Sequence, residues 1–330
     1  MSNTATVLAF DFGASSGRAI RAVYDGQNLT YEEIHRFENV PIEKDGHLCW
    51  DVETLLKEIH TAIQKAGTFD SLGFDTWGVD FGLLDADGHL LANPVHYRDA
   101  RTNGKPEQAA ACMPAEELYA HTGNQIMAIN TLFQLLALQE QEPELLQKAE
   151  QILFMPDLFA ALLGAEPVCE RSIASTSQML DPRTGQWSRE VLTAYGLKEN
   201  HFAPLVASGT VTGTLTTGAK IIAVAGHDTQ CASAAMPCAE EDAEHTAFLS
   251  CGTWSLLGTE LDTPILTADS CQSGLSNELG ANGKINYLKN IIGLWLIQES
   301  RREYKRRGQA YSFAELEQQA LAAEPLRSFI

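Results

Sequence analysis

The sequence predicts an α/β protein with two domains. Strand-like apolar runs alternate with stretches of helical periodicity over 330 residues, a length at which two domains are the usual expectation. The stretch 7–20, VLAFDFGASSGRAI, combines a strand, a loop of small residues and a returning strand. A similar unit, AFLSCGTWSL, returns at 247–256, after a polar, proline-led segment. We therefore expect a first domain over 1–236, a linker over 237–245 and a second domain over 246–330.

The loop in the first unit carries groups that suit a polyphosphate. Its small residues at 14–17 leave backbone N–H groups open, and Arg18 adds a positive charge. Such a loop can bind phosphate oxygens, and Asp11 at the strand end can hold Mg²⁺ directly or through water. An ordinary glycine hairpin with a surface arginine fits the same letters. Two such loops facing one another could hold one polyphosphate from both sides, although two unrelated hairpins would look the same.

The remaining elements follow from hydrophobic periodicity and from the residues that start helices. Asp51 and Asn130 are expected to cap helices, and Pro156 suits a first helical turn. We expect strands over 19–23, 29–37, 72–74, 221–225, 246–250, 254–258 and 284–288, and helices over 52–63, 131–139, 156–163, 230–236, 291–305 and 313–323.

Composition indicates which partners the protein can bind and in which cellular compartment it works. The chain has 23 basic and 43 acidic residues, a formal charge of −20, which argues against nucleic acid and against an anionic membrane surface. Seven cysteines form no C-x-x-C pair, which is typical of reduced thiols, and no leader or apolar run of membrane-spanning length is visible. We expect a cytoplasmic protein, and the sequence leaves its oligomeric state open.

Asp228 is the strongest catalytic candidate. It follows a buried strand and Gly226, and it opens a helix, the place where ligands bind in α/β sheets. An ionised carboxylate there can accept a hydroxyl proton as the oxygen attacks phosphorus. A plain helix N-cap explains the same residue equally simply.

A second polar cluster follows another apolar strand. Asp75, Trp77, Gly78 and Asp80 could line a polar pocket, with Gly78 allowing close backbone approach. The alternative is a hairpin with surface acids and a tryptophan in the core.

Ten stretches, which span nearly the whole chain, together resemble the FGGY family of carbohydrate kinases. They read FDFGASSGR, HRFENVP, WDVETL, GFDTWGVDFGLLD, YRDARTNG, NTLFQL, FMPDLF, AGHDTQCA, SCGTWSLLG and LKNIIGLWLIQ. The resemblance implies two ribonuclease-H-like domains of the actin/hexokinase/Hsp70 type around a central cleft. The family's second domain continues beyond the position matching Ile330 and carries its adenosine-binding glycine motif there, so the resemblance implies a truncated second domain in the residues given.

The resemblance also implies the activity. DTWGVDF together with HDT, SCGTWSL and LKNIIGLW resembles the family members that phosphorylate L-rhamnulose at its 1-hydroxyl, with ATP as co-substrate and Mg²⁺ or a similar divalent cation. Another ketose, such as L-fuculose or xylulose, remains an alternative, as does a sugar- or nucleotide-binding relative without phosphoryl transfer.

The resemblance assigns roles to individual residues. Asp228 would be the general base and Asp11 would serve the Mg²⁺. The expected ketose ligands are Gly78, His227, Asp228, Thr229 and Asn290. The expected ATP contacts are Ala14, Ser15, Ser16, Gly17, Arg18, Thr253 and Gln298.

Overall fold

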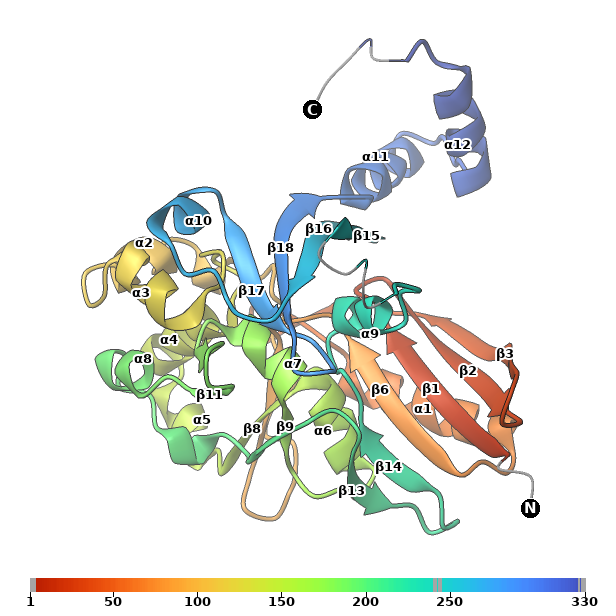
Figure 1. Cartoon of the computed structure of the whole chain (residues 1–330), viewed down its shortest axis with the longest axis horizontal. Coiled ribbons are helices and arrows are strands. Elements are labelled where there is room, and N and C mark those ends of the chain that lie inside the picture. The colour runs from red at the N-terminus through yellow and green to blue at the C-terminus, as the bar shows by residue number, and fades with distance from the viewer. Residues whose placement is uncertain (1–3, 240–241, 243–244, 326, 328–330) are drawn as a thin grey trace.

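Two β-sheets organise the protein into two lobes. The computed structural model describes residues 4–330 except 240–241, 243–244, 326 and 328–330. Helix α9 (Asp228–Ala234) lies between the two sheets (Figure 1). Within the described part of the chain, no helix is long and apolar enough to cross a bilayer.

The first lobe is built on a mixed six-stranded sheet. Its central strand β1 pairs antiparallel with β2 and parallel with β6, and this register places Asp11 beside Arg18 on one side and beside Asp75 on the other. The strands, in their order across the sheet, are β13 (Thr210–Thr214), β14 (Lys220–Ala223), β6 (Ser71–Thr76), β1 (Ala5–Phe12), β2 (Ser16–Tyr24) and β3 (Leu29–Glu38).

An aromatic cluster forms the core behind this sheet. The Phe10 ring stacks on Phe74 with centroids 4.8 Å apart, and Phe12 meets Phe159 of α6 (Met155–Leu162) edge to face at 5.1 Å. Phe10, Phe12 and Phe159 are fully buried. Each such ring stabilises the fold by about 1.5–3 kcal/mol through burial, so the cluster fixes the strand ends that carry Asp11 and Asp75.

The second lobe is built on a smaller, wholly antiparallel sheet. Its strands, in order, are β15 (Phe248–Cys251), β16 (Trp254–Leu261), β18 (Ile285–Ile292) and β17 (Leu275–Leu279). Phe248, Leu256 and Leu288 form its own buried cluster, with Met236 and Trp254 packed against it. Helices α11 (Trp295–Arg306) and α12 (Phe313–Ala322) extend beyond the sheet (Figure 1).

Short strand pairs and helices complete the described structure. The pairs are β4 (Ile42–Lys44) with β5 (His47–Cys49), β7 (Phe81–Leu84) with β8 (Gln151–Phe154), β9 (Cys169–Glu170) with β12 (Leu205–Val206), and β10 (Leu180–Asp181) with β11 (Gln186–Trp187). The other helices are α1 (Val52–Ala66), α2 (Lys105–Ala109), α3 (Ala115–Thr122), α4 (Thr131–Gln141), α5 (Pro143–Lys148), α7 (Arg171–Ala174), α8 (Arg189–Ala194) and α10 (Ala268–Gln272).

Several predicted elements are confirmed, with three differences of detail. The Asp51 side chain caps α1 by accepting the Thr54 N–H at 3.1 Å, as expected. Asn130 stands in the N-cap position of α4, but its side-chain oxygen accepts no N–H of that helix, and its amide nitrogen donates to the Gln125 carbonyl and to Gln178. The second strand begins at Ser16 rather than near residue 19, and β18 continues through Ile292, where a helix was expected from 291. The limits of the two domains stay a prediction, since the expected linker 237–245 includes residues outside the described part.

Candidate active site

A cavity of about 340 Å³ lies between the two lobes. Glycine-bearing loops border it on both sides, at Gly13–Ser15 between β1 and β2 and at Gly252–Thr253 between β15 and β16. The two strand–loop–strand units of the sequence therefore do face one another. Nine of the predicted site residues line this cavity, namely Ala14, Ser15, Gly78, His227, Asp228, Thr229, Thr253, Asn290 and Gln298.

The other predicted site residues lie in the strands behind the first loop. Ser16, Gly17 and Arg18 belong to β2, so the exposed loop is shorter than expected. A Cβ atom on Gly17 would collide with the Phe37 ring and lie 3.0 Å from Phe12, so close packing accounts for this glycine. The Arg18 guanidinium is already paired with Asp11, at 2.6 Å from Nη2 to Oδ2. The nucleotide roles of Ser16, Gly17 and Arg18 and the metal role of Asp11 stay predictions.

Asp228 presents one occupied and one open oxygen. It is the first residue of α9, with His227 in the N-cap position, so the simple N-cap alternative does not describe it. Its Oδ1 accepts the Thr229 backbone N–H at 2.6 Å and the Thr229 hydroxyl at 3.3 Å, and lies 3.4 Å from His227 Nε2. In the described part of the chain, Oδ2 accepts no hydrogen bond. Burial, reinforced by the nearby Asp11 charge, raises the pKa of Asp228 despite the lowering effect of His227. A raised pKa makes the ionised carboxylate a better proton acceptor.

His227 is held between carboxylates from both lobes. Its Nδ1 lies 2.9 Å from Glu278 Oε2 of β17, opposite the side that faces Asp228. Burial alone would lower the pKa of His227, but the charges of Glu278, Asp228 and Asp75 outweigh it and raise the pKa to about 9. A raised pKa favours the imidazolium, which donates a hydrogen bond from Nδ1 to Glu278 and forms an ion pair with Asp228 through Nε2.

The carboxylates around Asp11 suit a divalent cation. Asp11 stands next to Asp75 across the parallel strands, and Asp75 does not line the cavity. Burial, followed by the charges of Asp11 and Asp228, raises the pKa of Asp75 well above its usual value. Oxygen ligands and an excess of negative charge are what Mg²⁺ prefers. Asp11 offers a carboxylate of this kind, and the metal at Asp11 stays a prediction.

The turn after β6 is strained and firmly anchored. Val79 has a φ of 68°, which is unusual for a β-branched residue, and its N–H donates to the Thr176 hydroxyl at 3.2 Å. The carbonyl of Val79 accepts the Thr131 hydroxyl at 2.6 Å. Strain of this kind is found where the surroundings fix a functional segment. Here the hydrogen bonds of Val79 hold the neighbouring Gly78 backbone against the cavity.

Asp80 does not line the cavity, so the expectation that two carboxylates of this segment form a polar pocket is wrong. It is 1% exposed and accepts hydrogen bonds from Trp50, Trp77, Gln134 and the Tyr97 backbone at 2.7–3.1 Å. Burial raises the pKa of Asp80 to about 6 against these donors. Asp80 is a structural centre that holds the Trp77 ring in the cavity wall.

In the second lobe, hydrogen bonds hold the segments that carry Thr253, Asn290 and Gln298. The Leu294 N–H donates to the Gly252 carbonyl at 3.0 Å, and Gln298 donates to the Thr253 hydroxyl at 3.4 Å. Asn290 on β18 reaches across the lobes to Gln125, with 3.3 Å between Nδ2 and Oε1. The start of α11 thus fixes the loop that faces the first lobe.

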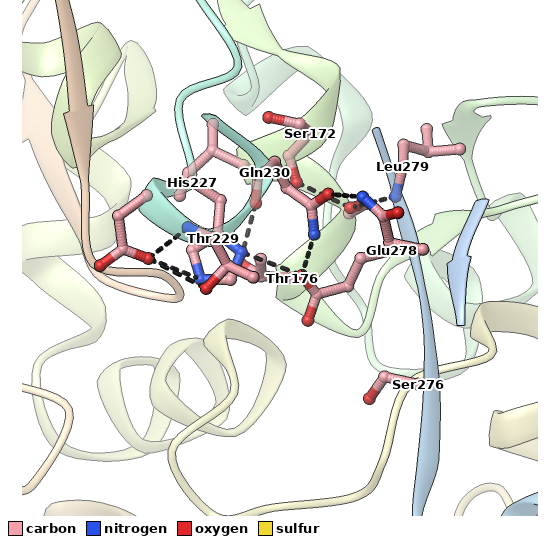
Figure 2. Close-up of polar contacts among 12 residues, drawn as sticks. Ser172, Thr176, His227, Thr229, Gln230, Ser276, Glu278 and Leu279 are labelled. Carbon is pink, nitrogen blue, oxygen red and sulfur yellow. Dashed lines mark hydrogen bonds and ion pairs between the residues drawn. The ribbon is translucent and has the colours of Figure 1, made fainter. Parts of the chain in front are cut away.

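Sequence reasoning missed Glu278 and Gln230. Glu278 is 4% exposed, and its Oε2 also accepts a hydrogen bond from Gln230 Nε2 at 2.7 Å. Figure 2 shows Glu278 approaching His227 and Gln230. Strand β17 was not among the predicted elements, and no local motif marks its glutamate, because the partner residues lie 51 and 48 positions earlier in the chain.

Solved structures of sugar kinases share this two-lobed fold. Gluconate kinase from Lactobacillus acidophilus is 16% identical, with a TM-score of 0.76 over 91% of this chain and 62% of its own. A xylulose kinase from Brucella ovis (its title reads "xyloylose kinase") is 21% identical, with a TM-score of 0.74 over 93% of this chain and 64% of its own. These likenesses confirm the expected actin/hexokinase-like α/β architecture.

Family models define the class further. The N-terminal domain of the FGGY family of carbohydrate kinases matches residues 6–234, and its C-terminal domain matches residues 247–330. The chain belongs to the FGGY family of carbohydrate kinases and is a sugar kinase.

Curated relatives give the particular resemblance. Rhamnulokinase from Bacteroides thetaiotaomicron is 41% identical over 98% of this chain and 68% of its own length. Rhamnulokinase from Enterococcus faecalis is 39% identical over 98% of this chain and 67% of its own length. The chain thus spans about two thirds of the length of these relatives.

Proposed function

We propose that this protein transfers the terminal phosphoryl group of ATP to the 1-hydroxyl of L-rhamnulose, giving L-rhamnulose 1-phosphate for L-rhamnose breakdown. Relatives named rhamnulokinase, 38–41% identical over nearly the whole chain, support the choice of sugar. The observation that carries the chemistry is the open Oδ2 of Asp228, in a cavity bordered by loops of both lobes.

Asp228 acts as the general base. Its Oδ2 accepts the proton of the sugar 1-hydroxyl as that oxygen attacks the phosphoryl group. Its Oδ1 stays bound to Thr229 and His227, so the carboxylate keeps one orientation. The ketose occupies the part of the cavity lined by Gly78, His227, Thr229 and Asn290.

The nucleotide phosphates lie against the loops of both lobes. Ala14 and Ser15 supply backbone and hydroxyl donors from the first lobe, and Thr253 and Gln298 supply donors from the second. Ser16, Gly17 and Arg18 support this loop from β2, with Arg18 adding positive charge near the phosphates. Asp11 would hold Mg²⁺, which when bound would neutralise phosphate charge. Closure of the lobes excludes water and so limits hydrolysis of ATP.

A cytoplasmic location belongs to the same proposal, since the reaction consumes ATP. The proposed partners are small molecules, with neither nucleic acid nor a membrane among them, consistent with the charge of −20.

The test is product formation. The full chain is incubated with ATP, Mg²⁺ and a panel of L-rhamnulose, L-fuculose and xylulose, and the phosphorylated product is identified by NMR. We expect L-rhamnulose 1-phosphate as the main product. Faster turnover of another ketose would reassign the substrate, and sugar binding without ATP turnover would favour the non-catalytic alternative.

A further inference from the structure

Glu278 is a buried acid of the second lobe to which the proposed reaction gives no direct role. It lies on β17, and its Oε2 accepts hydrogen bonds from His227 and Gln230, both of the first lobe (Figure 2). A buried carboxylate is costly unless it is paired. Glu278 meets this requirement with donors of the other lobe, which points to a role beyond packing within its own sheet.

We propose that Glu278 is a positioning residue that fixes the His227 ring from across the lobe boundary and so holds the proton-accepting carboxylate of Asp228 in place. This inference rests on the proposed function, because it gives Asp228 the role of base. It adds that the second lobe, rather than the first alone, prepares that base.

The orientation of the imidazole ring is the first step in this argument. His227 Nδ1 donates to Glu278 at 2.9 Å, and the ring then directs Nε2 toward Asp228 Oδ1 at 3.4 Å. A Cβ atom on Gly78 would lie 3.4 Å from the same Nε2, so this edge of the ring also borders the cavity. Rotation of the ring away from Glu278 would remove the donor from Asp228 and alter the cavity wall together.

The charge of the ring is the second step. Carboxylates face His227 from three elements, namely Glu278 on β17, Asp228 on α9 and Asp75 on β6. Glu278 makes the shortest contact and is the largest favourable influence on the charged ring. The imidazolium in turn opposes the burial that raises the pKa of Asp228. Loss of the Glu278 charge would therefore weaken a donor that keeps Asp228 ionised.

The attachment of Glu278 to the first lobe is the third step. Gln230 donates to Glu278 at 2.7 Å and accepts from Asn286 of β18, whose amide also donates to Ser233 at 2.9 Å. The next residue of β17, Leu279, donates its N–H to the Ser175 hydroxyl at 2.9 Å. These contacts join the lobes around Glu278 and hold it beside His227, so preparation of the base needs the lobes to be joined in this way.

The test replaces Glu278 by its uncharged isostere in the full chain. In Glu278→Gln we expect kcat to fall about tenfold or more, with a smaller change in the KM for sugar. We expect the alkaline limb of the kcat–pH profile to lie near pH 9 in the unchanged protein, where His227 loses its proton, and to move down by at least one pH unit in Glu278→Gln. Glu260→Gln is the matched control, because Glu260 lies on β16 of the same sheet and its carboxylate accepts an exposed hydrogen bond from Asn282 of its own lobe.

A second measurement does not need turnover. The ¹³C-labelled histidine signals are titrated by NMR, and the His227 signal is assigned from its loss in His227→Gln. We expect the pKa of His227 to fall by more than one unit in Glu278→Gln and to change less in Gln230→Met, which removes one donor to Glu278 but leaves its charge. This measurement separates failure of the inference from failure of the proposed sugar kinase reaction, since it reports the ion pair even in an inactive protein.

Three results would overturn the inference. The first is an unchanged His227 titration in Glu278→Gln. The second is a loss of kcat that follows the loss of thermal stability with an unchanged pH profile, which would make the role structural. The third is a rise in the KM for sugar alone, which would make Glu278 a direct sugar ligand. If Glu278→Gln does not fold, Glu278→Asp serves in its place, because it keeps the charge but withdraws it from His227, and an unchanged His227 titration in that variant would count against the inference.

Discussion

The two oxygens of Asp228 have different surroundings, and this difference leads to a prediction about the base. Asp228→Asn keeps the shape and can still accept the Thr229 N–H, but it cannot accept a proton. We expect kcat to fall by about 10²-fold or more, with sugar affinity much less affected. Steady-state kinetics with calorimetric sugar binding would measure both, and a variant with more than half of the original kcat would exclude Asp228 as the base.

Gly78 leads to a prediction about the sugar pocket. A Cβ atom there would lie 3.4 Å from both His227 Nε2 and Thr176 Cγ2, so alanine just fits while a branched side chain does not. We expect Gly78→Val to weaken L-rhamnulose binding by about tenfold or more through this steric overlap, with nucleotide binding largely intact. Gly78→Ala serves as the control. An unchanged KM for the sugar in Gly78→Val would show that this glycine does not face it.

At the scale of residues, the sequence identifies functional candidates that lie next to a glycine or a turn at the end of a predicted strand. Asp228 follows a glycine after a buried strand, and Gly78 lies in a turn after another strand, so both could be found before the structure was known. Glu278 and Gln230 could not, because their importance comes only from contacts across the lobes. The burial of Asp80 was also hidden, since three of its four donors, Trp50, Tyr97 and Gln134, come from other segments of the chain.

At the scale of elements, the predicted strands are placed correctly but their ends are not. Pairing with β1 as far as Gly17 and with β3 at Ser16 extends β2 toward the loop, because antiparallel partners supply hydrogen bonds that no local pattern reveals. Similarly, the apolar run from Ile291 to Ile297 suits either a strand or a helix. Pairing of Trp254 with Ile292 extends the strand, and the helix starts only after Gly293.

The packing of β2 leads to a prediction about Gly17. A methyl group there would collide with the Phe37 ring, so Gly17→Ala must displace that ring from its edge-to-face contact with Phe12. We expect the free energy of unfolding to fall by about 1–3 kcal/mol from this overpacking, as measured by urea denaturation. Gly13→Ala is the control, since its nearest neighbour would be the Ser16 carbonyl oxygen at 3.4 Å. Unchanged stability with weaker ATP binding would favour a direct nucleotide role for Gly17.

At the scale of the molecule, the two lobes are unequal. The aromatic core of the first lobe is continuous with helices on several sides, whereas the described second lobe buries a small cluster around Leu288. The sequence predicted two α/β units with facing loops, and the structure confirms that arrangement. It could not predict how much the second lobe depends on contacts with the first, because those contacts join residues far apart in the chain.

Arg98 is one such contact, and it leads to a prediction about lobe closure. Its guanidinium lies 4.8 Å from the Trp295 ring centroid and 5.4 Å from that of Trp254, both in the second lobe, and 5.2 Å from the Tyr97 ring of its own lobe. Arg98→Met keeps an apolar stem but removes the charge. Because cation–π contacts contribute about 0.5–2 kcal/mol each, we expect the KM for ATP to rise severalfold and the tryptophan fluorescence to change.

The matched control for Arg98→Met is Arg301→Met, which removes a guanidinium stacked on Phe313 at 4.5 Å, with both residues in the second lobe. Arg301→Met should leave the KM for ATP unchanged, because its contact does not join the lobes. The hydrogen bond from the Trp295 N–H to the Thr253 carbonyl, at 3.2 Å, connects the Arg98 contact to the loop proposed to face the phosphates. Loss of the Arg98 contact should therefore raise the KM for ATP more than the KM for sugar. Equal effects of the two arginine variants, or a change in sugar KM alone, would show that Arg98 does not hold the lobes together around the nucleotide.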